Sequence, residues 1–156
     1  MNFTVVTVGK INKDFILDGI NNYYKRINHY KKIELLYVRE ERIAPKITTK
    51  LILRKEGNRI LEKVPKDGLW LSLDRKGREM SSEEHFEFLN AQAKRGLKKL
   101  YYIIGGPLGL SSEVLGQCDE RLSLSRMTFP HELCVLLLLE QLYRYVNFMA
   151  GEKYHK

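Results

Sequence analysis

The sequence predicts an α/β fold in which a largely parallel sheet is flanked by helices. Short apolar or β-branched runs alternate with longer segments whose apolar residues recur at helical spacing, which gives the order βαβαβαβαβα. Residues 101–104 are apolar without alternation, which is typical of a strand buried on both faces. At 156 residues, the chain is long enough to form one domain with a core of its own.

Two predicted strands and two predicted helices occupy the first part of the chain. The first strand is β-branched and apolar, and apolar residues at helical spacing predict the helix after it. The charged residues 39–47 contain a proline and predict an exposed loop. In order, the elements are a strand over residues 2–8, a helix over 13–30, a strand over 33–38 and a helix capped by Thr48 or Thr49 that reaches about Val64.

Three more strands and three more helices are predicted beyond this point. Ser81 and Glu84 have the spacing of a capping box, and Pro130 is expected in the first turn of the last helix. In order, the segments are a strand over residues 69–73, a polar loop over 74–80, a helix from Ser81 to about Arg95, a strand ending at Ile104, a short helix over 112–117, a strand over 121–125, a loop over 126–129 and a helix to about Ala150.

The excess positive charge belongs to the first part of the chain. Residues 1–66 contain 15 Lys or Arg and 7 Asp or Glu, whereas residues 67–156 contain 12 of each, so the first 66 residues hold the whole net charge of +8. This distribution predicts that the basic half, residues 1–66, meets a polyanion while residues 67–156 have another role. The alternative is a basic surface that is only solvated.

Three loops at the carboxyl ends of the predicted strands form the candidate site. Ligands of open parallel sheets bind beyond these ends, so the loops after Leu73, Ile104 and Leu124 are expected to lie together. Three glycines within the five residues after Ile104 allow positive φ angles and a close approach of the backbone to a ligand. An ordinary tight turn between a strand and a helix is the alternative.

Several other kinds of site and location are disfavoured. Cys118 and Cys134 lack the spacing of a disulfide, zinc or redox pair, and the glycine loop matches neither GxxxxGK[ST] nor GxGxxG. The longest apolar run, residues 133–139, is far shorter than the roughly 20 residues that cross a bilayer, and no export signal is evident. A cytoplasmic protein that does not span a membrane is therefore expected. A metal site is not expected either, because the histidines are scattered: His29, His85, His131 and His155.

The last predicted helix is apolar on nearly every face over residues 133–139. One face can pack on the sheet, which leaves another face that needs a second cover. A symmetric homodimer through this helix supplies that cover. A helix that is deeply buried within a monomer is the alternative.

Four stretches of the chain carry a resemblance to a known family. They are IGGPLGL at residues 104–110, LSLSRMTFPHEL at 122–133, LEQLYRY at 139–145 and the terminal GEKYHK. With VGK at residues 8–10 and KEG at 55–57, the similarity covers essentially the whole chain. The sequence resembles the RlmH family, the small SPOUT-type methyltransferases of bacterial 23S rRNA.

The resemblance implies a SPOUT-type fold with a trefoil knot in the C-terminal half, and a homodimer. It also implies S-adenosylmethionine as the methyl donor, and N3 of a pseudouridine in 23S rRNA of the assembled 70S ribosome as the acceptor. By position, the implied cofactor-binding residues are Leu73, Gly105, Leu124, Ser125, Arg126, Met127, Thr128 and Phe129. These residues belong to the same three loops.

Methylation of an imide nitrogen needs a group that accepts or weakens its proton. The candidate catalytic residues are His131, Tyr154 and His155, and the candidate RNA-binding or charge-stabilising residues are Arg126, Arg144 and Lys156. Capping of the last helix is the alternative role of His131. The chain end is expected to reach the partner's site across the dimer, and a frayed end is the alternative.

Two other functions compete with the methyltransferase. A non-catalytic RNA-binding or ribosome-associated factor would use the basic half without the cofactor. A nucleotide-binding α/β enzyme of small-molecule metabolism would have no need of the basic half. The presence of the three strand-end loops together with the Tyr-His-Lys ending favours the methyltransferase over the RNA-binding factor. Dependence of the activity on ribosomal particles would separate the methyltransferase from the metabolic enzyme.

Overall fold

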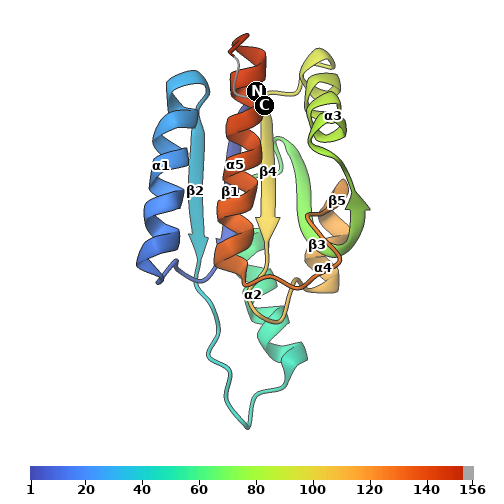
Figure 1. Cartoon of the computed structure of the whole chain (residues 1–156). Helices are drawn as coiled ribbons and strands as arrows, with labels where there is room; N and C mark the ends of the chain where they lie inside the picture. The colour runs from blue at the N-terminus through green and yellow to red at the C-terminus, as the bar shows by residue number, and fades with distance from the viewer. Residues whose placement is uncertain (153–156) are drawn as a thin grey trace.

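A computed structural model describes residues 1–152 and contains one sheet of five parallel strands (Figure 1). The order across the sheet is β2-β1-β4-β3-β5, so β4 lies at the centre. The predicted parallel sheet is confirmed. The strands are β1 (Asn2–Val8), β2 (Ile33–Val38), β3 (Leu69–Glu79), β4 (Lys99–Ile104) and β5 (Glu120–Ser123).

Helices cover both faces of the sheet, with α1, α5 and α3 on one face and α2 and α4 on the other (Figure 1). The predicted caps are confirmed: the Thr48 side chain accepts a hydrogen bond from the Leu51 amide, and Ser81 and Glu84 form a capping box. The helices are α1 (Asp14–Tyr30), α2 (Thr49–Lys63), α3 (Ser82–Lys94), α4 (Ser112–Gln117) and α5 (His131–Met149).

The sheet separates two apolar cores, which explains the strands without alternation. Neighbouring residues of β1 and β4 face opposite sides: Val5 and Tyr102 pack with α1, α3 and α5, whereas Val6 and Ile103 pack with α2 and α4. All four side chains are fully buried. Because both faces are covered, each position along these strands has to be apolar.

The polar loop predicted over residues 74–80 is wrong, because β3 continues to Glu79. The strand pairs with β5 through Leu73, and the register then shifts before pairing resumes at Arg78. Glycine is required at position 77, where the register shifts, because a Cβ there would lie 2.7 Å from the Arg121 carbonyl oxygen. The polar residues therefore form an irregularity within β3, where it pairs with the edge strand β5.

The fifth strand and the last helix also differ slightly from expectation. β5 ends at Ser123, so Leu124 and Ser125 belong to the following loop, where the Ser123 hydroxyl donates to the Ser125 carbonyl at 3.0 Å. This bond turns the chain away from the sheet. Pro130 is the N-cap residue of α5 rather than a member of its first turn.

Within residues 1–152, no helix combines the length and apolar character that a membrane span requires. Three expectations from the sequence stay predictions. They are the trefoil knot, the division into a basic half (residues 1–66) and a cofactor-binding half (residues 67–156), and the cytoplasmic location.

A buried histidine lies in the core between α3 and β4. His85 is 4% exposed, and its Nε2 is hydrogen-bonded to the Tyr102 hydroxyl at 2.9 Å. Burial lowers the pKa of His85 from 6.5 to about 4. The folded protein therefore keeps this imidazole neutral at pH values at which the unfolded chain protonates it.

This pKa difference predicts a loss of stability in acid. Between pH 6.5 and 4 the unfolded state binds the proton and the folded state does not, so the contribution of His85 is complete above pH 6.5 and falls by about 3 kcal/mol towards pH 4. Urea unfolding of the wild type and His85→Gln across this range measures the difference, because glutamine does not titrate. Equal pH dependence of the two proteins would contradict it.

Candidate active site

A cavity of about 920 Å³ lies at the carboxyl ends of β4 and β5, beside residues 73–76 of β3 and the start of α5. All three predicted loops contribute to its wall. Its size is within the range of about 300 to 1,000 Å³ that is typical of ligand pockets. The predicted site residues that line it are Leu73, Gly105, Leu124, Ser125, Met127, Thr128, Phe129 and His131.

The loop after β4 is a tight turn whose backbone faces the cavity. The Gly109 amide donates to the Gly106 carbonyl at 2.9 Å, and Gly109 has a φ of +87°. Gly105 and Gly106 have ordinary φ angles, so the expected positive φ is found at one of the three glycines. Gly105 is required by space instead: a Cβ there would lie 2.4 Å from the Gly109 carbonyl oxygen. The turn is thus tight and also forms part of the cavity.

The loop after β5 is held in place by its own hydrogen bonds. The Met127 amide donates to the Ser125 hydroxyl at 3.0 Å, and Thr128 accepts from the Arg75 guanidinium at 3.0 Å. Arg75 belongs to the irregular part of β3 and lines the cavity with its neighbour Lys76. The sequence prediction missed both residues, although it placed the segment that contains them at the site.

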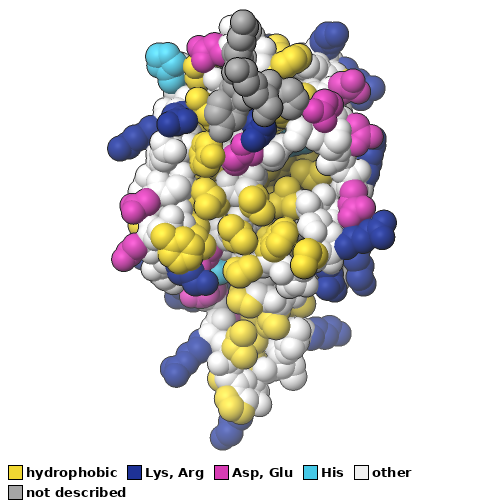
Figure 2. All heavy atoms as spheres, in the orientation of Figure 1, with side chains coloured by type: hydrophobic (Ala, Val, Ile, Leu, Met, Phe, Trp, Pro, Cys, Tyr) yellow, Lys and Arg dark blue, Asp and Glu magenta, His cyan; other side chains and the backbone are white. Residues whose placement is uncertain are grey.

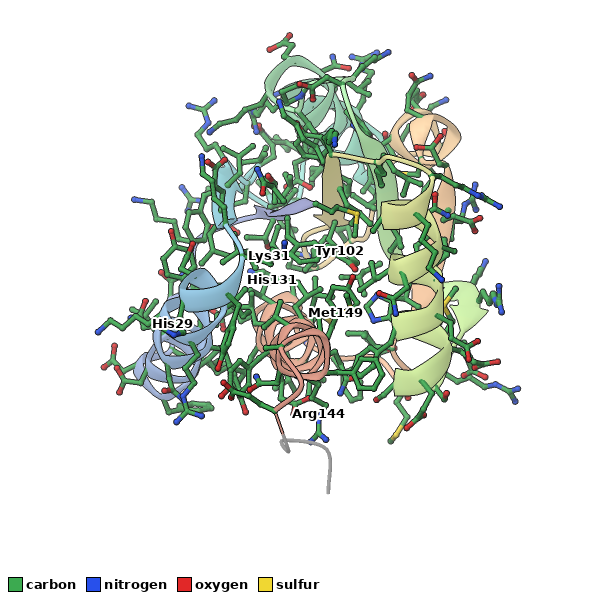
Figure 3. The ribbon with its side chains drawn as sticks, turned by 90° about the horizontal axis from the view of Figure 1, so that it is seen from above. His29, Lys31, Tyr102, His131, Arg144 and Met149 are labelled. Carbon is green, nitrogen blue, oxygen red and sulfur yellow. The ribbon has the colours of Figure 1, made fainter. Side chains whose placement is uncertain are left out.

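His131 is the first residue of α5 and lines the cavity. Its proposed role as a helix cap is wrong, because Pro130 is the N-cap and no side chain caps this helix. Its Nε2 is buried and has no hydrogen-bond partner among residues 1–152. This nitrogen and a carboxylate oxygen of Glu40 both lie within 3.3 Å of the position that a Cβ on Gly9 would occupy. In Figure 3, His131 lies between the sheet and α5.

Two predicted arginines do not line the cavity. Arg126 is 88% exposed at its side chain and forms an ion pair with Glu79 at 3.3 Å. Arg144 forms an ion pair with Glu140 one turn earlier on α5 at 2.5 Å, and it projects away from the sheet (Figure 3). Neither reaches the site of its own protomer in this conformation. The remaining candidates, Tyr154, His155 and Lys156, lie outside the described residues.

Burial affects two ionisable groups in and near the cavity. Cys134 lines the wall, and burial raises the pKa of its thiol. Behind the glycine turn, Glu56 is 4% exposed and accepts a hydrogen bond from the Glu41 amide at 2.8 Å, and burial raises the pKa of its carboxyl. Among residues 1–152, no cluster of three or more His, Cys, Asp or Glu side chains is arranged for a metal ion.

Comparison with known sequences identifies relatives over the full length. A family model described as "Predicted SPOUT methyltransferase" matches residues 1–155. A protein of Carboxydothermus hydrogenoformans is 42% identical and one of Clostridioides difficile is 43% identical, each over 159 aligned residues that cover both chains completely. Both relatives are named ribosomal RNA large subunit methyltransferase H.

Solved structures share the fold at low sequence identity. A Legionella pneumophila protein, whose structure contains the bound cofactor SAM, superposes with a TM-score of 0.52 at 10% identity. The match covers 92% of this chain and 66% of that protein. This likeness shows a shared fold alone. The family model and the full-length relatives show which family the chain belongs to. On those grounds, this chain belongs to the SPOUT methyltransferase family.

Proposed function

We propose that this protein transfers a methyl group from S-adenosylmethionine to N3 of a pseudouridine in 23S rRNA of the assembled ribosome. The observation that carries the proposal is one cavity formed by residues 73–76 of β3 and the loops after β4 and β5, in a chain whose full-length relatives are named rRNA methyltransferases. The basic first 66 residues support an RNA substrate, because their excess of cations attracts phosphate groups.

The cavity fits a cofactor that combines an adenosine with a charged amino acid tail. Apolar side chains such as Leu115, Leu124 and Phe129 line it together with the backbone of the glycine turn. Gly105 and the turn that ends at Gly109 leave room for a ligand against main-chain atoms, which a larger residue at position 105 would disturb. When bound there, S-adenosylmethionine supplies a methyl group that is already activated by the positive sulfur.

The residues of the chain then have to orient the acceptor base and take its N3 proton. We assign the role of general base, which accepts the N3 proton, to His131. Its buried Nε2 has no partner among residues 1–152, the residue lines the cavity, and imidazole is the usual general base near neutral pH. Arg75 and Lys76 lie on the same wall and can stabilise negative charge on the base. Tyr154, His155 and Lys156 are proposed to add to the site of the partner protomer.

A labelled methyl-transfer assay tests the reaction. Ribosomes from a strain that lacks this activity are incubated with the protein and labelled S-adenosylmethionine, and the rRNA nucleosides are analysed by mass spectrometry. We expect one product, N3-methylpseudouridine. A folded protein that transfers no label to ribosomes, subunits or free rRNA would instead support the non-catalytic RNA-binding factor.

We propose further that two copies associate through the outer face of α5. Leu133 and Leu137 are half-buried and lie outside both apolar cores, and Phe148 on the same helix is 55% exposed. Figure 2 shows hydrophobic side chains distributed over the face that α5 occupies. A second copy that packs the same face against this one covers those side chains symmetrically.

Charged residues on this face are expected to separate the dimer. Light scattering of the Leu133→Glu, Leu137→Glu double variant should give the mass of a single 18.3 kDa chain, whereas the wild type gives twice that mass. Ile43→Glu, which changes an exposed apolar residue elsewhere, is the matched control and should stay dimeric. Dimeric double-variant protein would contradict this interface.

A further inference from the structure

A basic projection extends from the end of the sheet at which the strands terminate and the cavity opens. Residues 39–55 comprise the loop between β2 and α2 and the first two turns of α2, and they are called the basic arm here. The arm contains six Lys or Arg residues and two Glu residues. It extends beyond the ends of the strands in Figure 1, and Figure 2 shows dark blue side chains along the projection and at its tip.

The base of the arm is fixed by contacts with α2. Glu41 accepts from Arg59 at 2.5 Å and from Lys55 at 3.2 Å, and the Arg39 carbonyl accepts from Arg59 at 3.0 Å. The Glu41 amide donates to Glu56, whose carboxylate lies behind the glycine turn. These contacts set the direction in which the arm leaves the body of the protein.

Of the two carboxylates of the arm, Glu41 takes part in ion pairs and Glu40 takes part in none within residues 1–152. Glu41 is engaged by Lys55 and Arg59, and Glu40 is directed towards Gly9 and His131. The exposed side chains of Arg42, Lys46 and Arg54 take part in no ion pair within residues 1–152. The arm therefore presents a row of cations that no carboxylate of the described chain neutralises.

The arm adjoins the site through a second cavity. A space of about 400 Å³ lies beneath it, between Arg42 and Ile43 on the arm and Pro107 and Leu108 on the glycine turn. Three carboxylates, those of Glu40, Glu41 and Glu56, also line this space, so it does not suit a phosphate group. Pro107 and Leu108 also line the larger cavity. Ile43 is 60% exposed, so an apolar side chain stands between the cations near the tip. A polyanion with planar apolar bases matches this combination of charge and apolar surface.

We propose that the basic arm binds the phosphate backbone of the RNA strand next to the target nucleotide and thereby directs that nucleotide towards the cavity. This inference rests on the proposed function for its RNA substrate. Arg42, Lys46 and Arg54 contact phosphates through their exposed side chains. The arm thus contributes to recognition of the RNA, while residues 73–76 of β3 and the loops after β4 and β5 bind the cofactor.

A charge-matched pair of variants tests the arm. The arm variant carries Arg42→Gln, Lys46→Gln and Arg54→Gln. The control carries Lys31→Gln, Lys94→Gln and Lys98→Gln, three exposed cations at the amino ends of the strands, so both proteins fall from a net charge of +8 to +5. All six positions are exposed, and thermal unfolding should confirm that both variants are as stable as the wild type.

Binding to ribosomes is measured against salt concentration, and methyl transfer is measured separately. In the arm variant we expect KM for ribosomes to rise at least about tenfold and the slope of log K against log salt to fall by about 2, since roughly 0.7 to 0.9 ions are released per phosphate contact. Its affinity for S-adenosylmethionine should stay within about twofold of the wild type, because the substituted side chains lie outside the larger cavity. The control should match the wild type in all three measurements.

An arm variant that matches the control in KM and salt slope would overturn the inference while leaving the methyltransferase proposal intact. Equal losses in both variants would also overturn it, because they would indicate non-specific attraction by net charge. If the wild-type protein binds ribosomes but transfers no methyl group, the proposed function is wrong. The ribosome affinities of the two variants and their salt dependence would still test the role of the arm in RNA binding.

Discussion

Replacing Gly105 by alanine is expected to weaken S-adenosylmethionine binding by about 100-fold. The new Cβ would lie 2.4 Å from the carbonyl oxygen and 2.5 Å from the carbonyl carbon of Gly109, and backbone atoms cannot move aside as a flexible side chain can. The turn has to open, which displaces the main-chain groups that line the proposed cofactor cavity. Loss of two hydrogen bonds costs roughly 2 to 3 kcal/mol, which corresponds to this change in affinity. Isothermal titration with the cofactor measures it.

Two further variants make the result interpretable. Gly116→Ala is the matched control, because Gly116 lies in α4 and a Cβ there meets nothing within 4 Å. Leu124→Glu leaves the turn unchanged and places a carboxylate in the cavity wall, so it tests the same site if Gly105→Ala unfolds. Wild-type affinity in folded Gly105→Ala or in Leu124→Glu would show that the cofactor binds elsewhere.

Replacing His131 by glutamine is expected to lower kcat by roughly 100-fold, the lower part of the range for loss of a general base. Glutamine keeps polar atoms at the start of α5, but its amide cannot accept a proton at neutral pH. The affinity for S-adenosylmethionine should change by less than about threefold, because the proposed role concerns the acceptor base. Single-turnover methyl transfer with saturating cofactor and ribosomes gives the rate of the affected step.

His29→Gln is the control for this experiment. His29 is exposed near the end of α1, far from His131 in Figure 3, so its loss should leave the rate unchanged. A His131→Gln protein with a wild-type rate would exclude the assigned base and would shift attention to Tyr154 and His155. A weakened cofactor affinity at an unchanged rate would indicate a binding role for His131.

The parallel sheet and the loops after β4 and β5 could be predicted because their causes are local, whereas the loop predicted after Leu73 is part of β3. Strands buried on both faces require continuous apolar runs such as residues 101–104, and the capping box of Ser81 and Glu84 fixes the start of α3 within a few residues. In a parallel sheet, every loop that follows a strand lies at the same edge. The positions of the loops therefore followed from the order of the elements.

Contacts between distant segments could not be predicted in the same way. The extension of β3 requires a residue without a side chain at position 77, because the Arg121 backbone lies close to it. The hydrogen bond between Arg75 and Thr128 joins residues 53 positions apart. The approach of Glu40 and His131 to Gly9 likewise involves three separate elements. Each of these depends on tertiary packing, which no local pattern of residues records.

The order β4-β3-β5 has a consequence for the entropy of ligand binding. The cavity is surrounded by residues 73–76 of β3 and by the loops after β4 and β5. These three strands are hydrogen-bonded neighbours, and the loop after β5 is further tied to β3 through Arg75. The walls are therefore ordered when the sheet forms, before any ligand arrives. A ligand that enters loses its own translational and rotational freedom but has little protein backbone to immobilise, so the site is preorganised by the same ladder that stabilises the fold.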